Sequence, residues 1–170
     1  DLKQLLFILT TADDGGVPLQ FRCEDGNTND APTHQETWDF LRKATGRSDF
    51  LYVADSKLCN RPAMDHIHYQ GGRLVTVLPR TRLEDREFRE WIQTNTPDWV
   101  LVRDEVNPRC KEGPRDRWWT CRYRMPSAEG WPVVWLRSEL LALNQERRRQ
   151  ERLARATQEL EDLRSKLLGP

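Results

Sequence analysis

The stretch "DFLYVADSKLCN", from Asp49 to Asn60, places a short apolar run directly before a carboxylate. The residues from Phe50 to Ala54 have the composition of a buried β-strand, and the run stops at Asp55. In an open α/β sheet, functional groups collect just beyond the carboxyl ends of the strands, where a crevice forms. Asp55 therefore has two interpretations: a functional carboxylate at such a crevice, or a cap that accepts backbone N–H bonds before residues such as Leu58.

The residues upstream of this strand predict a β-hairpin followed by a helix. The segments "LLFILT" and "VPLQFRCED" flank turn residues from Asp13 to Gly16, which supply the backbone freedom of a tight connection. Thr33 and Glu36 then form a capping-box pattern, which predicts that a helix begins at Thr33. We expect this helix to end at Gly46.

The residues downstream predict a second helix and a further strand. The helix is expected over Arg61–Tyr69, with Pro62 in its first turn, where proline is tolerated. Two glycines then precede "RLVTVLP", a run rich in β-branched residues. The order from Leu2 to Pro79 is therefore β-β-α-β-α-β, which indicates a mixed α/β sheet.

Beyond Pro79 the sequence predicts a β-rich segment over residues 80–137 and a polar helix over residues 138–170. The helix-like "LEDREFREWIQT" leads into three strand-like runs, "WVLVRDEV", "RWWTCRYRM" and "WPVVWLRS". In the last segment, apolar residues recur at helical spacing: Leu153, Ala156, Leu160, Leu163 and Leu167. This pattern covers about two heptads, short of the roughly three to four that indicate a coiled coil, and favours packing on the protein's own core.

Composition restricts the class of protein. Lys and Arg number 27 and so do Asp and Glu, so net charge alone draws the chain neither to nucleic acid nor to a membrane. No run approaches the roughly 18 apolar residues that cross a bilayer, and no leader is recognisable, so we expect a cytoplasmic protein without a membrane partner. The four cysteines form no CxxC pair, which favours reduced thiols.

Two further groups of residues were candidates for chemistry. Cys59, His66 and His68 resemble a ligand cluster, but a spacing of two sets the histidines on different helix faces, which argues against a metal site. The run from Arg103 to Arg124 carries seven basic and four acidic residues around several aromatic residues. Such a run either holds phosphates and stacks on bases, or forms a strand with one core face and one solvated face.

Four strings in order, "DLKQLLFILT", "EDGNTND", "FLYVADSKL" and "GGRLVTVLPRTR", resemble the middle of DDE transposases of bacterial insertion sequences. The resemblance is to the branch whose ribonuclease H-like core is interrupted by a β-rich insertion, and it runs from Asp1 to about Arg82. It implies an α/β fold: a ribonuclease H-like mixed sheet with flanking helices over residues 1–79, the insertion over residues 80–137, and then the long helix.

The resemblance also implies a function. Such enzymes use carboxylates to hold two Mg²⁺ or Mn²⁺ ions that activate water or a 3′-hydroxyl against a DNA phosphodiester. Asp55 matches the second carboxylate of the triad, and is thus expected to be both catalytic and a metal ligand. The implied partners are transposon-end and target DNA and, at synapsis, a second copy, in a bacterial cytoplasm where the enzyme joins the nucleoid. The expected DNA-binding residues are Arg80, Arg82, Arg115, Arg117, Trp118 and Arg122.

The sequence also departs from the family pattern. The first carboxylate lies upstream of residue 1, so Asp1 does not take that role. The third is a glutamate within a Tyr, Arg, Glu, Lys pattern, which none of Glu139, Glu146 and Glu159 provides. We therefore expect a central fragment of a longer protein that neither cuts nor joins DNA alone. Two alternatives stay open: a non-catalytic DNA-binding or interaction module derived from a transposase, and an unrelated α/β phosphotransfer domain with Asp55 at its crevice.

Overall fold

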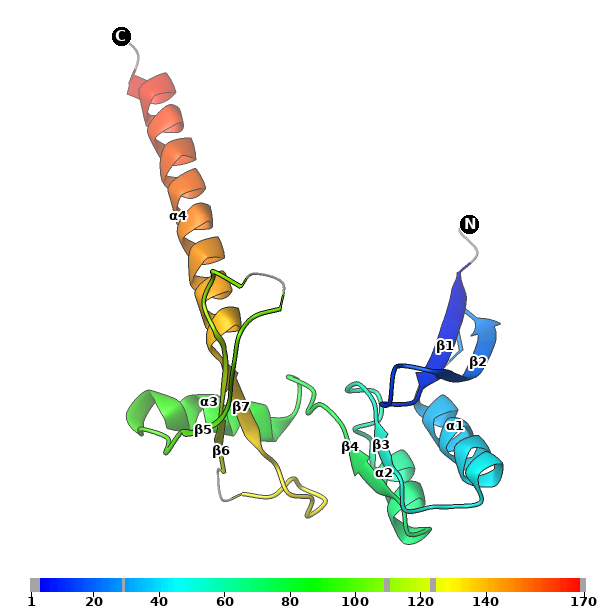
Figure 1. The fold of residues 1–170 in the computed structure, drawn as a ribbon. Helices are drawn as coiled ribbons and strands as arrows, with labels where there is room; N and C mark the ends of the chain where they lie inside the picture. The colour runs from blue at the N-terminus through cyan, green and yellow to red at the C-terminus, as the bar shows by residue number, and fades with distance from the viewer. Residues whose placement is uncertain (1–3, 29, 109–110, 123–124, 169–170) are drawn as a thin grey trace. The chain divides into compact units, whose positions relative to one another are not determined.

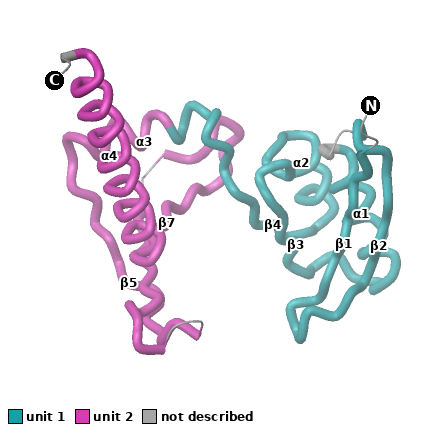
Figure 2. Tube along the Cα trace, turned by 90° about the horizontal axis from the view of Figure 1, so that it is seen from above, with its two compact units in different colours: residues 1–85 teal, residues 86–170 magenta. Residues whose placement is uncertain are grey.

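A computed structural model describes residues 4–28, 30–108, 111–122 and 125–168 of the chain, and within them the fold is mixed α/β (Figure 1). These residues form four helices and seven strands, and the strands make three small sheets. The chain divides into two compact units, unit 1 from Asp1 to Asp85 and unit 2 from Arg86 to Pro170 (Figure 2). The terminal residues Asp1 and Pro170 lie outside the described residues.

Unit 1 begins with the predicted hairpin, which is confirmed. Strand β1 (Leu5–Thr11) pairs antiparallel with β2 (Pro18–Asp25). Gly15 and Gly16 of the turn have φ angles of 83° and 67°, a left-handed conformation that glycine adopts without a steric penalty.

Helix α1 (Asp30–Thr45) begins three residues before the predicted start, so the capping-box prediction is wrong. Thr33 is buried within the helix and does not precede it. Pro32 lies in the first turn of this helix, where proline is compatible with a start upstream of it. The predicted end is confirmed: the helix stops before Gly46, whose φ is 67°.

Strand β3 (Leu51–Val53) pairs in parallel with β4 (Arg73–Val75), and helix α2 (Arg61–Tyr69) connects them. The bounds of α2 are those predicted. Asn60 caps the helix, because its side chain accepts the backbone N–H of Ala63 at 3.0 Å. Both strands are shorter than the apolar runs that predicted them.

Helices α1 and α2 pack together against one face of β3 and β4, and this contact forms the core of unit 1. Its buried residues are Trp38, Leu41, Tyr52, Leu58, Ala63 and Ile67. The other face of these strands is uncovered: Leu51, Val53 and Val75 are each more than half exposed. Since side chains alternate along a strand, Tyr52 points to the helices while its two neighbours point away from them.

The single mixed sheet expected over residues 1–79 is not formed by the described residues. They make two separate two-stranded sheets, β1-β2 and β3-β4. Within the described part of the chain, β1 and β3 each pair along one edge only. Among the residues that the structure describes, no strand-to-strand hydrogen bonds join β1 to β3.

Helix α3 (Leu83–Thr94) begins in the last residues of unit 1 and continues into unit 2, where an antiparallel sheet follows. The sheet has the order β5 (Val100–Glu105), β6 (Asp116–Cys121) and β7 (Trp135–Ser138), as the three strand-like runs predicted. Phe88 of α3 stacks on Trp135 of β7 with ring centroids 3.9 Å apart. Aromatic stacking therefore joins the helix to the sheet.

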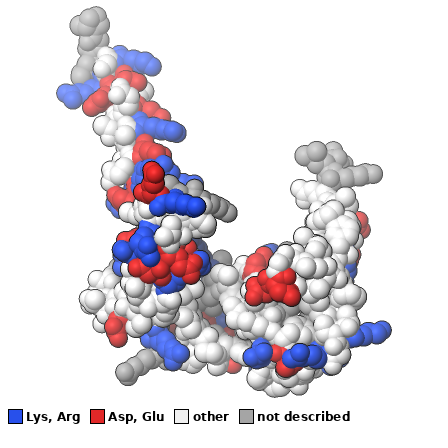
Figure 3. Space-filling model, viewed as in Figure 1, with Lys and Arg blue, Asp and Glu red and all other residues white. Residues whose placement is uncertain are grey.

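Helix α4 (Glu139–Leu168) contacts β6 and β7 but leaves its leucine stripe exposed. Leu153, Leu160, Leu163 and Leu167 are all at least half exposed, so the expected packing on the protein's own core is not made by the described residues. The reason is length: 30 residues make a helix of about 45 Å, far longer than the four-residue β7. Figure 3 shows basic and acidic side chains interspersed along this helix. Of the helices described, none has the length and apolar character needed to cross a membrane.

Candidate functional site around Asp55

Asp55 lies two residues beyond β3 and its side chain is 74% exposed. Its Oδ1 accepts the backbone N–H of Lys57 at 2.9 Å. Its main-chain carbonyl accepts the hydroxyl of Thr76 at 2.5 Å and the N–H of Leu58 at 3.2 Å. The local turn thus fixes the position of Asp55, while α2 is capped by Asn60. Asp55 therefore caps the local turn by accepting the N–H of Lys57, but it does not cap helix α2.

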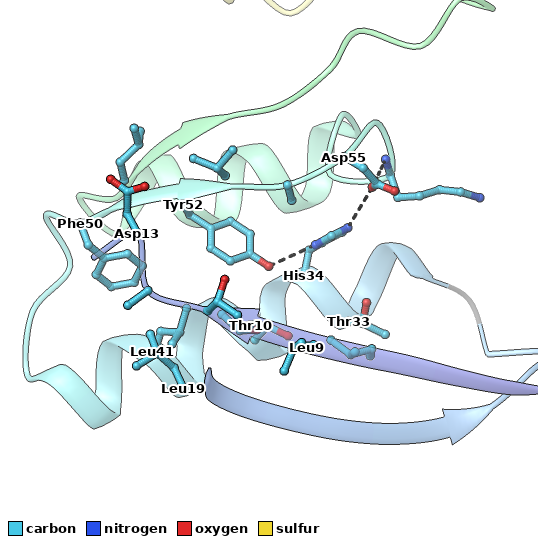
Figure 4. Close-up of a pocket in the computed structure, with 18 of the residues that line it drawn as sticks. Leu9, Thr10, Asp13, Leu19, Thr33, His34, Leu41, Phe50, Tyr52 and Asp55 are labelled. Carbon is cyan, nitrogen blue, oxygen red and sulfur yellow. Dashed lines mark hydrogen bonds and ion pairs between the residues drawn. The ribbon is translucent and has the colours of Figure 1, made fainter. Parts of the chain in front are cut away.

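The structure places His34 and Tyr52 beside Asp55 (Figure 4). His34 lies in α1, and its Nε2 is 3.9 Å from Oδ1 of Asp55. Its Nδ1 lies 3.2 Å from the hydroxyl of Tyr52, which is buried in the core. The three side chains therefore form a chain of polar contacts from the core to the exposed carboxylate.

Sequence reasoning missed His34, although a signal for it exists. His34, Trp38 and Leu41 are spaced by four and three residues, which places them on one face of α1. Because Trp38 and Leu41 face the core, His34 faces β3 as well. Its proximity to Asp55 still depends on how α1 packs on β3, which spacing alone does not give.

Burial raises the pKa of Tyr52 to about 12, and this effect outweighs the hydrogen bond with Thr37, which lowers the pKa. The neutral phenol is thus the form that the fold stabilises. The contribution of Tyr52 to stability is complete below about pH 10, the ordinary tyrosine pKa, and is lost as the pH rises towards 12.

We expect unit 1 to lose about 1 kcal/mol of unfolding free energy between pH 9 and pH 11 through Tyr52. Urea unfolding followed by amide signals of unit 1 measures this loss. In Tyr52→Phe the pH-dependent part should disappear, because phenylalanine does not titrate. The control is Tyr69→Phe, since Tyr69 is 79% exposed and its removal should leave the loss unchanged. An equal loss in Tyr52→Phe would assign the pH dependence to another group.

A cavity of about 1240 Å³ lies between β1, α1 and β3. Asp55 and His34 border one end of it, and Phe50 and Asp13 border the other (Figure 4). Figure 4 also shows the chain running from Leu9 towards Asp13 in the direction opposite to its course from Phe50 to Asp55. The cavity is therefore bordered by two strands that run in opposite directions, each with an edge that pairs with no other described strand.

Most of the residues expected to bind DNA have acidic partners. Arg115 and Arg117 both lie within ion-pair distance of Asp104, and Arg117 is also 3.7 Å from Glu139. The hydrogen bond from Arg115 lowers the pKa of Asp104, so the carboxylate stays charged. Arg115, just before β6, and Arg117, within β6, thus form ion pairs with β5, and Arg117 also pairs with the start of α4.

Of the remaining expected DNA-binding residues, two have acidic partners and two are exposed. Trp118 donates its indole N–H to Asp116 at 2.8 Å, and Arg82 pairs with Glu84 at 2.7 Å. The side chains of Arg80 and Arg122 are exposed. Because the six residues are distributed over both units, the structure does not define a single surface made of all of them.

The donors near Asp55 fit part of a metal site. Within the described residues, no three or more His, Cys, Asp or Glu side chains are grouped so that they could hold a metal ion. The oxygens of Asp55 suit Mg²⁺ or Mn²⁺, and the imidazole of His34 is a second possible donor. Two of the three glutamates compared with the third carboxylate have partners in unit 2: Glu139 lies near Arg117, and Glu146 accepts a hydrogen bond from Gln150. Cys59, which forms no disulfide among the described residues, is half-buried.

Comparison of the chain with protein-family models, curated proteins and solved structures gave no match. Assignment of a function therefore rests on the residues and geometry around Asp55.

Proposed function

We propose that this chain is the central part of a DDE transposase with a ribonuclease H-like core, in which Asp55 is the second metal-binding carboxylate. The observation that carries the proposal is the exposed carboxylate of Asp55, held just beyond β3 at one end of the cavity. A carboxylate that is fixed by its backbone yet open to solvent is suited to bind an ion and a phosphodiester. The proposed activity is cleavage and transfer of DNA strands at transposon ends.

The edges of β1 and β3 that pair with no described strand support this proposal. The resemblance implies a further strand, upstream of residue 1, that carries the first carboxylate. Such a strand, inserted in the cavity, would pair antiparallel with β1 and parallel with β3, because these two run in opposite directions. It would merge the two small sheets into one mixed sheet of the ribonuclease H type.

The same insertion explains how a second carboxylate reaches Asp55. Parallel strands present their carboxyl ends at the same edge of a sheet. A carboxylate near the carboxyl end of the inserted strand would therefore lie beside Asp55, which follows the carboxyl end of β3. Two carboxylates at one edge supply the hard oxygen ligands that Mg²⁺ and Mn²⁺ require.

In the proposed mechanism, the role of this chain is to orient the Asp55 carboxylate before an ion binds. When bound, the divalent ions would activate the attacking water or 3′-hydroxyl and neutralise charge on the phosphate. Asp55 supplies an oxygen ligand, while the N–H of Lys57 fixes Oδ1 and the Thr76 hydroxyl fixes the main chain. This arrangement orients the carboxylate before an ion arrives, which lowers the entropic cost of binding.

The experiment that tests the function is a DNA strand-cleavage assay on the protein extended by its flanking coding sequence. We expect cleavage that requires Mg²⁺ or Mn²⁺ and is lost in Asp55→Asn. The flanks should encode a strand with an aspartate upstream and a helix with tyrosine, arginine, glutamate and lysine downstream. Divalent-dependent cleavage by the 170-residue chain alone would contradict the inferred distribution of the triad.

The second candidate function is a DNA-binding module without catalysis, and the exposed Arg122 beside β6 is the observation that favours it. This function needs no metal, so DNA binding should survive Asp55→Asn. The ion pairs of Arg117 count against it, because a guanidinium that pairs with Asp104 and Glu139 is less available to phosphates.

We expect the double variant Arg117→Ala, Arg122→Ala to lower the salt slope of DNA binding by about one, the contribution of Arg122 alone. Fluorescence anisotropy with a labelled duplex, over a series of salt concentrations, measures the slope. The control is Arg61→Ala, because Arg61 lies on α2 and pairs with Asp65. A decrease of about two would show that Arg117 leaves its acidic partners to bind phosphate, whereas no decrease would exclude both residues from the contact.

A further inference from the structure

We propose that two copies of this chain associate through helix α4, as a parallel pair of helices that face each other along the leucine stripe. The stripe consists of five residues on one face of the helix: Leu153, Ala156, Leu160, Leu163 and Leu167. The stripe lies in unit 2, so this association is independent of the role proposed for Asp55 in unit 1.

The apolar face of α4 is left uncovered by the described residues. The four leucines of the stripe are each at least half exposed, and Leu160 is 66% exposed. Ala156 is exposed as well. Contiguous apolar patches are unusual on proteins that stay monomeric, because they keep apolar surface in water. A partner on this face would remove that surface from water.

The spacing of the stripe fits a second helix of the same kind. Leu153, Leu160 and Leu167 are seven residues apart, and so are Ala156 and Leu163. A repeat of seven keeps the same face of a helix turned towards a partner helix. Helix α4 is continuous through these positions. The stripe covers about two heptads, so we expect a weak contact that depends on concentration.

Charged residues beside the stripe favour the parallel orientation. Glu159 and Arg164 flank the stripe on opposite sides, five residues apart, and both are exposed. Neither side chain forms an ion pair with another described residue. In a parallel pair, Glu159 of each helix lies next to Arg164 of the second copy. Two pairs of opposite charge would thus border the contact, one on each side.

Antiparallel arrangements fit the same residues less well. When Leu153 lies opposite Leu163, Glu159 of one helix faces Glu159 of the other, so like charges meet. When Leu160 instead lies opposite Leu163, Leu153 faces no residue of the stripe. The parallel pair buries all five members of the stripe and brings opposite charges together.

The test of the surface is sedimentation equilibrium of the 170-residue chain from micromolar to submillimolar concentrations. We expect a monomer and a dimer whose proportion rises with concentration. In Leu160→Lys the dissociation constant should rise at least about tenfold, because each copy places a charge in the apolar contact. The matched control is Leu141→Lys, since Leu141 is 56% exposed on the same helix and outside the stripe. It should associate like the native chain.

Two results would overturn the surface: a native chain that stays monomeric throughout, or a Leu160→Lys variant that associates as tightly as the native chain. Circular dichroism of each variant checks that the helix is retained. Association through the exposed strands of unit 1 would give the second result, because it does not involve the stripe.

An exchange of charges tests the orientation. Glu159→Arg and Arg164→Glu should each weaken association several-fold, because like charges then meet in the parallel pair. An equimolar mixture of the two variants should associate about as tightly as the native chain, since both pairs of opposite charge are restored in the mixed dimer. In the antiparallel arrangements Glu159 does not meet Arg164, so the mixture would gain nothing. A mixture that associates no more tightly than the separate variants would therefore overturn the parallel arrangement.

Discussion

Truncation of Trp38 to alanine is expected to lower the free energy of unfolding of unit 1 by about 3–5 kcal/mol. The side chain is fully buried and lies at the centre of the contact between α1, α2 and β3. Its ring meets Phe50 at 6.0 Å and the edge of His66 at 5.8 Å between centroids. Alanine would lose these contacts and leave a cavity that the surrounding helices can close only in part.

The exchange of backbone amides in α1 and α2 is the suitable measurement for this loss. Tryptophan fluorescence would report mainly on unit 2, which holds six of the seven tryptophans. The control is Phe40→Ala on the same helix, because Phe40 is 42% exposed and its removal should cost about 1 kcal/mol or less. Equal losses in the two variants would contradict a core centred on Trp38.

Replacement of Asp55 by asparagine should lower the rate of strand cleavage by the extended protein at least about 10³-fold, or roughly 4 kcal/mol of transition-state stabilisation. Asparagine has nearly the shape of aspartate, and its amide oxygen can still accept the N–H of Lys57. The turn after β3 should therefore persist, while the negative charge that holds the ion is lost. DNA binding should remain within about twofold of the native value.

Single-turnover cleavage of a labelled transposon end, with divalent ion in excess, measures this rate. The matched control is Asp49→Asn: this aspartate is also exposed, precedes β3 and pairs with Arg47. It should leave the cleavage rate unchanged. A rate in Asp55→Asn within tenfold of the native enzyme would exclude Asp55 from the triad.

The elements that were predicted best are those with local signals. The bounds of α2 and α3 follow from the residues at their ends, among them Asn60 and Pro62 at the start of α2. The β1-β2 hairpin follows from the two glycines of its turn. In each case the interactions that fix the element lie within a few residues along the chain, so the sequence contains them.

The features that could not be predicted depend on distant contacts. The apolar runs around β1 and β3 indicated strands, but which strands pair with each other depends on contacts that are distant along the chain. The leucines of α4 have core spacing, yet no described element covers Leu160 or Leu163. Periodicity indicates which face of an element is apolar, and it does not identify what covers that face.

The candidate site likewise combines features that have a local signal in the sequence with features that depend on distant contacts. The position of Asp55 just beyond a strand could be predicted, because the end of an apolar run is visible in the sequence. The proximity of His34 could not, since it lies 21 residues away and meets Asp55 only through the packing of α1 on β3. The pairing of Arg115 with Asp104 likewise requires β5 and β6 to be adjacent. From the sequence, this basic and aromatic run was compatible with a nucleic-acid surface and with a strand that has one solvated face, and the structure adds the cross-strand ion pairs within it.

A titration of the ¹⁵N-labelled chain with Mn²⁺, followed by amide line broadening, tests most directly whether Asp55 is a metal ligand. We expect the amides of Lys57 and Leu58 to lose intensity first, because they lie in the turn that holds the carboxylate. This broadening should disappear in Asp55→Asn and persist in Asp49→Asn. Equal broadening of these amides in Asp55→Asn, or broadening centred elsewhere in unit 1, would show that Asp55 does not bind the ion.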